Sequence, residues 1–124
     1  MKIIKCEICG KMAAVIKDSA CPTMCCGRAM EELVPNTTDA AQEKHVPVIS
    51  VDGTCVLVEV GSVAHPMIEE HFIEWIILET KHGRQRVELC PGAEPKAYFA
   101  LVEGDEPVAA YAYCNLHGLW KAEI

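Results

Sequence analysis

The chain has 124 residues, which is the usual size of one domain. Hydrophobic residues make up 51% of it, and its formal net charge is -7 at neutral pH. This acidic balance argues against nucleic acid binding, which requires a basic face. Since no apolar run reaches the length of a membrane span or a signal peptide, we expect a cytoplasmic protein that binds neither nucleic acid nor membrane.

Five of the eight cysteines fall within the first 26 residues. In a reducing compartment, clustered thiols indicate metal binding rather than disulfides. Cys6 and Cys9 form a Cys-x-x-Cys knuckle followed by glycine, and Cys25 and Cys26 supply two more thiols. Four thiolates make a tetrahedral site that suits iron or zinc.

Two choices remain for the second half of this site. Adjacent cysteines cannot both point the same way in an extended chain, so a Cys21/Cys25 pair competes with the Cys25/Cys26 pair. We prefer the adjacent pair, with Cys21 spare and the tetrahedron distorted. A module of residues 1–35 cannot bury enough apolar surface to fold alone, so the metal should be its core.

Regular structure is expected to be mostly β. Residues 12–16 are predicted to form a short strand, residues 33–39 a linker, and residues 39–44 one or two turns of helix that Pro47 ends. Further strands are predicted at residues 46–51, 55–60, 72–80, 86–89, 96–102 and 108–113, with a first turn at Asp52–Gly53. About seven short strands with regularly spaced turns predict a β-sandwich, here over residues 36–124.

A second candidate metal site begins with Cys114 and His117, three positions apart on a loop after the last predicted strand. Further histidines lie upstream, at His45, His65 and His71, whereas His82 sits in a polar turn typical of a surface residue. Strand ends of a sandwich can gather such residues at one pole. Four neutral imidazoles and one thiolate would leave one position of an ion open for small-molecule chemistry.

Together these motifs resemble the desulfoferrodoxins, the two-iron superoxide reductases, over the whole chain. Cys6, Cys9, Cys25 and Cys26 match the desulforedoxin-like FeS4 centre. The catalytic iron motifs of that family are matched, in the same order, by residues 43–47, 65–67, 70–75 and 114–120.

The resemblance implies an immunoglobulin-like sandwich and a homodimer. It also implies a catalytic iron bound by His45, His65, His71, His117 and Cys114. Such a protein reduces superoxide by one electron to hydrogen peroxide in antioxidant defence, with a reduced carrier such as rubredoxin as the electron donor. The Cys114 thiolate would push electron density onto the iron, as cysteine does in some haem enzymes.

Two charged residues precede His45 and have predicted roles in catalysis. Lys44 would supply the positive patch that draws anionic superoxide towards an otherwise acidic chain. The resemblance implies that Glu43 caps the ferric iron once peroxide has left. Trp75, Trp120 and Met67 are interpreted as core or shielding residues.

Two other classes of protein compete with this interpretation. An electron carrier, blue-copper-like or rubredoxin-like, would have no catalysis of its own; blue-copper sites need an axial methionine, and none follows His117. A structural zinc protein would explain the N-terminal thiols but not the histidines.

Overall fold

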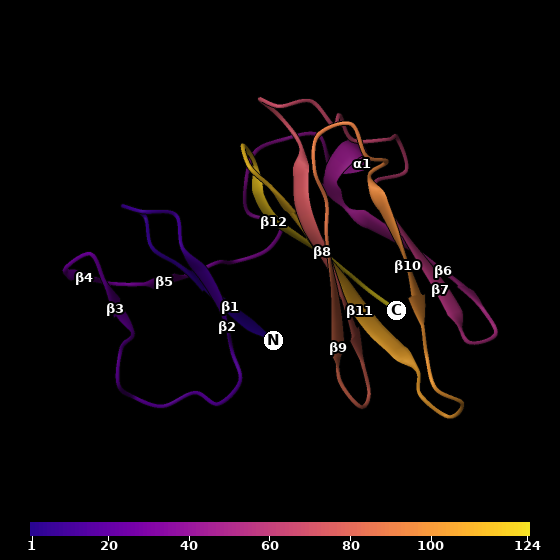
Figure 1. The fold of residues 1–124 in the computed structure, drawn as a ribbon, viewed down its shortest axis with the longest axis horizontal. Helices are drawn as coiled ribbons and strands as arrows, with labels where there is room; N and C mark the ends of the chain where they lie inside the picture. The colour runs from indigo at the N-terminus through magenta and orange to yellow at the C-terminus, as the bar shows by residue number, and fades with distance from the viewer. The chain divides into compact units, whose positions relative to one another are not determined.

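The computed structural model describes all residues 1–124, which form two compact units, Met1–Val34 and Pro35–Ile124. Strands make up nearly all of the regular structure (Figure 1), which confirms the predicted mainly β fold. The only helix, α1 (Gln42–His45), is a single turn, as predicted before Pro47. No helix is therefore long and apolar enough to cross a bilayer.

The first unit is a small three-stranded sheet with a separate hairpin. β1 (Lys2–Lys5) lies between β2 (Met12–Val15) and β5 (Glu31–Glu32), while β3 (Met24–Cys25) pairs with β4 (Arg28–Ala29). β2 was predicted, whereas the short strands around it were not. Only Ile3, Ile4 and Cys6 are buried apolar residues here, so the unit has very little core.

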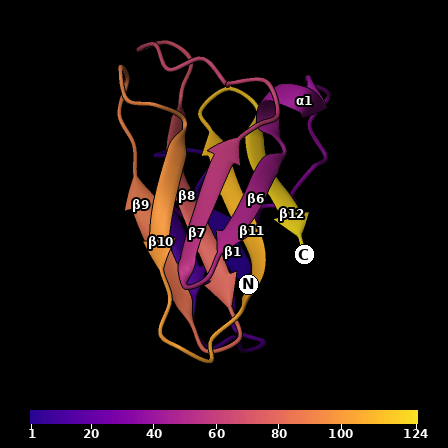
Figure 2. The ribbon, with the colours of Figure 1, turned by 90° about the vertical axis from the view of Figure 1, so that its right-hand side faces the viewer.

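The second unit is a sandwich of seven strands in two antiparallel sheets, as predicted. One sheet has the order β10–β7–β6, and the other has the order β12–β11–β8–β9 (Figure 2). Their bounds are β6 (Pro47–Asp52), β7 (Cys55–Val60), β8 (Ile73–Thr80), β9 (Arg84–Glu88), β10 (Lys96–Ala100), β11 (Pro107–Cys114) and β12 (Gly118–Glu123).

The core lies between the two sheets and follows from the alternation of side chains along each strand. In β7, Val56, Val58 and Val60 are completely buried, while the residues between them face outward. They pack with Ile76 and Leu78 of β8 in one continuous cluster. This core fixes the register of the strands, and hence the position of every strand end.

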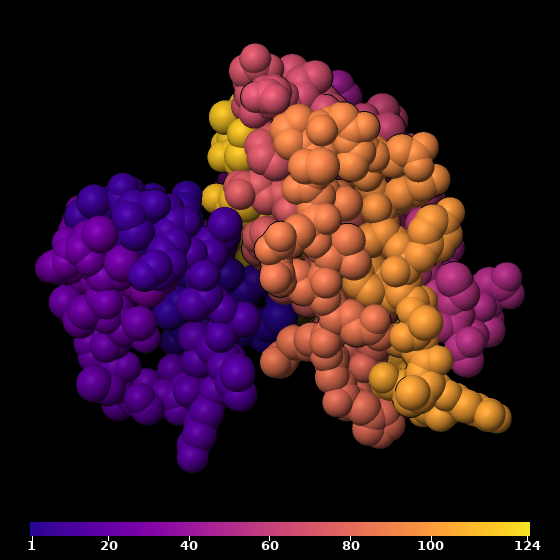
Figure 3. All heavy atoms as spheres, in the orientation of Figure 1, coloured from indigo at the N-terminus to yellow at the C-terminus, as the bar shows by residue number.

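One pole of the sandwich collects the strand ends that carry the candidate site. β6 begins there after α1, β7 ends there, β8 begins there, and the β11–β12 hairpin turns there (Figures 1 and 2). At the opposite pole, the β10–β11 loop projects from the body of the sandwich in the space-filling view (Figure 3). The antiparallel topology alone therefore brings residues 45, 65, 71 and 114–117 to one end.

The sequence-based predictions differ from the structure in this unit at one missed strand, at several strand bounds and at one turn. β12 was missed, because Gly118–Trp120 was taken as loop. β9 begins at Arg84 rather than at residue 86. The β6–β7 turn consists of Gly53 and Thr54, one position later than predicted, since Gly53 adopts the left-handed conformation with φ of 61°.

Candidate metal centres

In the first unit, the Cys6–Cys9 knuckle is held by backbone hydrogen bonds. The Gly10 amide donates to the Cys6 carbonyl at 2.9 Å, and the Cys6 amide donates to the Lys11 carbonyl at 2.9 Å. Gly10 has φ of 80°, which glycine adopts without strain. This turn directs both thiols of the Cys-x-x-Cys motif to the same side.

The second thiol pair lies on the β3–β4 hairpin. Cys25 pairs with Arg28, so Cys26 and Gly27 form a two-residue turn. Both turn residues have positive φ, 52° and 75°, as in a type I′ turn. Because Cys26 is in the turn and not in extended backbone, the adjacent thiols can converge, which removes the objection that favoured a Cys21/Cys25 pair.

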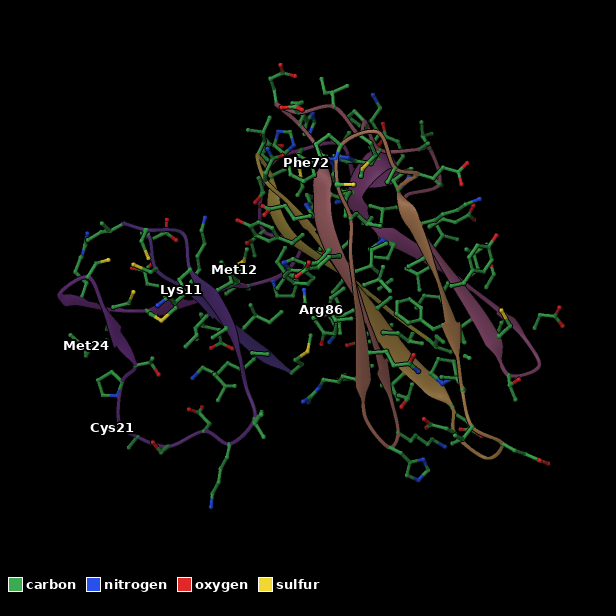
Figure 4. All side chains as sticks on the ribbon, viewed as in Figure 1. Lys11, Met12, Cys21, Met24, Phe72 and Arg86 are labelled. Carbon is green, nitrogen blue, oxygen red and sulfur yellow. The ribbon has the colours of Figure 1, made fainter.

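The structure brings together the four thiols of Cys6, Cys9, Cys25 and Cys26, whose sulfur atoms all lie within 4.8 Å of one another. The Cys9 and Cys25 sulfurs are 3.6 Å apart. Cys21 is not part of this group; it lies on the loop between β2 and β3 (Figure 4).

The pKa values of these thiols are consistent with a cation bound between them. Amide donors of Cys9 and Ile8 lower the pKa of Cys6 to about 6, so its thiolate forms readily. Hydrogen bonds to Cys9 and Cys6 raise the pKa of Cys25 to about 12. Four neighbouring thiolates therefore require a positive ion, and a tetrahedral iron or zinc ion has the right ligand preference.

In the second unit, the rings of four histidines form a square. Adjacent rings around it have centroids 4.6–5.0 Å apart and interplanar angles of 76–86°. The diagonal pair, His45 and His71, is 6.3 Å apart. The corners, in order, are His45, His65, His71 and His117.

Ring nitrogens of neighbouring histidines face one another in this square, as expected around a cation. His45 Nδ1 donates to the Ala41 carbonyl and His65 Nδ1 donates to the Pro66 carbonyl, both at 2.7 Å. Since carbonyl oxygens only accept, each Nδ1 carries the hydrogen and each neutral ring keeps a lone pair on Nε2. These two Nε2 atoms lie 3.2 Å apart.

That spacing matches metal coordination. Two nitrogens at right angles, each about 2.1 Å from one ion, are about 3 Å apart. Burial lowers the pKa of His65 to about 4, so its ring stays neutral at pH 7. His71 Nε2 is buried without a hydrogen-bond partner. The residues present therefore fit a bound metal ion.

Cys114 supplies a thiol to the same place. Its ligand atom lies within 4.8 Å of those of His45, His65 and His71, and its sulfur is 3.8 Å from His117 Nδ1. Burial raises the pKa of Cys114, while the amides of Leu116 and His117 act in the opposite direction. The thiolate thus needs both these amides and a cation beside it.

The β11–β12 hairpin explains the Cys-x-x-His-Gly spacing. Cys114 pairs with Gly118, so the loop is three residues long and is followed by this glycine, which has φ of 79°. Trp120 follows on β12, where its indole donates to the His117 carbonyl at 3.1 Å and its ring stacks on His45 at 4.8 Å. Trp120 is thus a supporting residue of the site as well as a core residue.

Two residues of metal-binding type lie outside this centre, as predicted for a surface histidine and a packing methionine. His82 is exposed and lies 3.1 Å from an Asp105 carboxylate oxygen, in the turn between β8 and β9. The Met67 sulfur accepts a hydrogen bond from the Ile73 amide at 3.4 Å, so it is a packing residue. A blue-copper site with an axial methionine does not match this arrangement.

Glu43 and Lys44 are exposed residues of α1, immediately before His45. The Glu43 carbonyl accepts a hydrogen bond from the Val63 amide at 2.8 Å, and a side chain at Gly61 would lie 2.6 Å from it. Burial, then His117, His45 and Lys44, lower the pKa of His71. The Lys44 ammonium thus acts electrostatically on the ring square.

Sequence reasoning missed one residue of this region. Asn115 makes hydrogen bonds on both sides of His71, through its side chain to Glu70 and Phe72. Its position between Cys114 and His117 was the only available signal, because its partners lie more than 40 residues earlier, with separations of 43 and 45.

Comparison with known proteins supports both centres. The profile of the family described as Desulfoferrodoxin matches residues 37–123. A desulfoferrodoxin from Syntrophotalea carbinolica is 48% identical over 123 residues, covering 99% of this chain and 96% of that protein. A superoxide reductase from Pyrococcus horikoshii is 39% identical, covering 66% of this chain and 86% of that protein.

A solved structure is similar over both units. The crystal structure of the superoxide reductase from Treponema pallidum has a TM-score of 0.82 and 38% sequence identity to this chain. The match covers 97% of this chain and 98% of that one.

Proposed function

The chain belongs to the desulfoferrodoxin family, and from the geometry of its second unit we propose the site at which it acts as a superoxide reductase. The observation that carries this proposal is the square of four imidazoles with the Cys114 thiol beside it. The ligands of the catalytic iron are His45, His65, His71, His117 and Cys114.

When bound there, iron(II) supplies one electron to superoxide, which takes up two protons to give hydrogen peroxide. The protein side of this reaction is to hold neutral rings and one thiolate around the ion. His45 and His65 are locked into the correct tautomer by the Ala41 and Pro66 carbonyls. His71 and His117, which are only half-buried, form the part of the square nearest to solvent.

Lys44 and Glu43 are the proposed catalytic side chains outside the ligand set. The Lys44 ammonium draws the anionic substrate to a chain of net charge -7 and remains near it during reduction. Glu43 would supply a carboxylate to the oxidised site once peroxide has left. Support for both roles is their exposed position on α1, directly before His45.

The first unit holds a second iron on Cys6, Cys9, Cys25 and Cys26, a place that zinc also suits. We place the boundary between the FeS4 module and the catalytic sandwich at residues 35 and 36. Since the module has few buried apolar residues, the metal replaces most of its core.

Three further properties belong to the same proposal. A reduced carrier such as rubredoxin supplies electrons, the protein is a homodimer, and it acts in the cytoplasm. Eight free cysteines suit a reducing compartment. Electron transfer from purified reduced rubredoxin and sedimentation of the protein in solution test the first two.

The test of function is the stoichiometry of the reaction. Protein reduced under anaerobic conditions should consume superoxide in pulse radiolysis, with one superoxide lost per iron oxidised at the histidine site. Hydrogen peroxide should form without oxygen, whereas dismutation would release oxygen. Oxygen release, or no oxidation of this iron by superoxide, would overturn the proposal.

Two histidine variants provide a matched comparison. His71→Ala should remove most of the iron at this site and nearly all of the reaction. His82→Ala changes an exposed histidine paired with Asp105, and it should retain both. Equal iron content in the two variants would contradict the assigned ligands.

A further inference from the structure

His71 is held differently from His45 and His65, the two buried corners of the square. His45 and His65 each have a ring hydrogen bond to a carbonyl of their own segment, at residues 41 and 66. The His71 Nε2 atom has no partner, and the backbone of His71 forms only an isolated bridge to Ile68. No side-chain hydrogen bond anchors its Nε2 atom, so contacts of the neighbouring backbone contribute to its position.

The Asn115 side chain contacts that backbone on both sides of His71. Asn115 Nδ2 donates to the Glu70 carbonyl at 3.0 Å, and the Phe72 amide donates to Asn115 Oδ1 at 3.0 Å. The Asn115 amide also donates to the Phe72 carbonyl at 3.2 Å. Phe72 lies where β8 begins (Figure 4).

We propose that Asn115 is a positioning residue of the metal site, which ties the segment of His71 to the loop of Cys114 and His117. This inference rests on the proposed iron site. The Asn115 side chain donates one of these hydrogen bonds through Nδ2 and accepts the other through Oδ1. A residue that replaces it must therefore both donate and accept. Asparagine does both, aspartate only accepts, and leucine does neither.

The chain contains a matched amide clamp away from the site. Asn36 Nδ2 donates to the Lys121 carbonyl at 3.0 Å, and the Lys121 amide donates to Asn36 Oδ1 at 2.8 Å. It ties the start of this unit to β12 and touches no proposed ligand. Asn36 has φ of 61°, a conformation that aspartate also tolerates, so Asn36→Asp is a fair control for Asn115→Asp.

The experiment measures how firmly the histidine site holds iron(II). Iron-loaded wild type, Asn115→Asp, Asn115→Leu and Asn36→Asp are mixed with a bipyridine chelator, and the rate of iron loss is followed. Both Asn115 variants should lose iron about 10-fold faster, the usual size of an outer-sphere effect. Their thiolate absorption after oxidation should also shift. The wild type and Asn36→Asp should agree.

The remaining outcomes of the chelator experiment separate a failure of the positioning role from a failure of the proposed function. Wild-type rates and spectra in both Asn115 variants, or equal losses in Asn36→Asp, would overturn the positioning role. The leucine variant separates loss of hydrogen bonds from the added charge of aspartate, and an effect of aspartate alone would also count against the role. A wild type that holds no iron at this site would instead refute the proposed function.

Discussion

Cys114 is the proposed thiolate ligand of the histidine site. It is completely buried and receives amide hydrogen bonds from Leu116 and His117. Cys114→Ser should abolish the thiolate-to-iron absorption of the oxidised protein and nearly all superoxide reduction, because a hydroxyl group donates much less electron density. Visible spectroscopy and pulse radiolysis of the reduced protein measure both effects.

Cys90→Ser is the control for that change, since Cys90 is an exposed cysteine outside both thiol groups. It should keep the wild-type spectrum and rate. A Cys114→Ser protein that retained its absorption band and its activity would contradict the whole ligand assignment.

Variants of Lys44 test whether the charge of this side chain draws superoxide to the site. An anion approaching a chain of net charge -7 is repelled overall, so the loss of Lys44 should slow superoxide capture by roughly 10-fold. Lys44→Arg should keep most of the rate if charge alone matters. Added salt should slow the wild type more than Lys44→Ala, because it screens the attraction. Pulse radiolysis across a salt series measures these rates.

The control removes the same charge at the other pole. Lys81 follows β8 and pairs with Glu106, and the length of β8 separates it from His71 by roughly 25 Å. Lys81→Ala should react nearly as fast as the wild type. Equal rates for Lys44→Ala and wild type at low salt would exclude steering by Lys44, whereas a slow arginine variant would indicate a hydrogen-bonding role.

At the scale of elements, Asp105 joins two loops at the pole opposite the metal site. It accepts hydrogen bonds from the Thr80 hydroxyl at 2.7 Å and the Glu106 amide at 2.9 Å. The Thr80 bond, followed by the Glu106 amide and His82, lowers the pKa of Asp105 below 3.8. Its ionised form therefore stabilises the fold above that pH, and this stability is lost as pH falls through the lower, folded-state pKa.

Asp105→Asn should accordingly melt at a lower temperature than wild type near pH 6, and the difference should shrink as pH falls towards 3. Thermal unfolding of both proteins across this pH range measures it. The wild type and the variant are compared at the same pH, so that the difference between them is the informative quantity. A constant difference at all pH values would show that the carboxylate charge does not contribute.

The elements that were predictable from sequence are those with strong alternation or long β-branched runs. β7 was placed without error and β8 to within one residue, because burial of Val56, Val58 and Val60 gives a clear period of two. β12 was not predictable, since its hydrogen bonds depend on the hairpin that Gly118 allows. β1 is a four-residue strand whose partners lie at residues 12–15 and 31–32, and nothing local specifies it.

For the sites, residue types and their order were enough to predict which side chains gather. The convergence of Cys25 and Cys26 was harder to predict, because positive φ at a cysteine is uncommon and has no sequence signature. The hydrogen bonds of the Asn115 side chain were not predictable, because their partners are backbone groups. Every residue has such groups, so the sequence does not show which of them Asn115 contacts.

At the scale of the whole molecule, the two units have different sources of stability. The first unit has three buried apolar residues, whereas the second has the continuous core between its sheets. Cys9→Ser should therefore lower metal binding in residues 1–35 and leave that unit open to proteolysis, while the sandwich melts as in the wild type. Metal analysis, limited proteolysis and calorimetry measure this.

Cys21→Ser is the matched change, because Cys21 is an exposed cysteine of the same unit that lies outside the sulfur group. It should leave metal content and melting unchanged. Loss of metal in this variant would return Cys21 to the ligand set, and an unchanged Cys9→Ser protein would contradict the metal-centred module.

Because the ligand-bearing strand ends all lie at one pole, the opposite pole is available for protein engineering. The β6–β7 turn there is two exposed residues, Gly53 and Thr54, with no proposed ligand in either adjoining strand. Exposed loop tips of this kind are where domain insertions and circular permutations succeed most often. A fluorescent reporter inserted between Gly53 and Thr54 is therefore expected to retain superoxide reduction, although the Thr54 carbonyl accepts a hydrogen bond from the Leu101 amide at 2.8 Å.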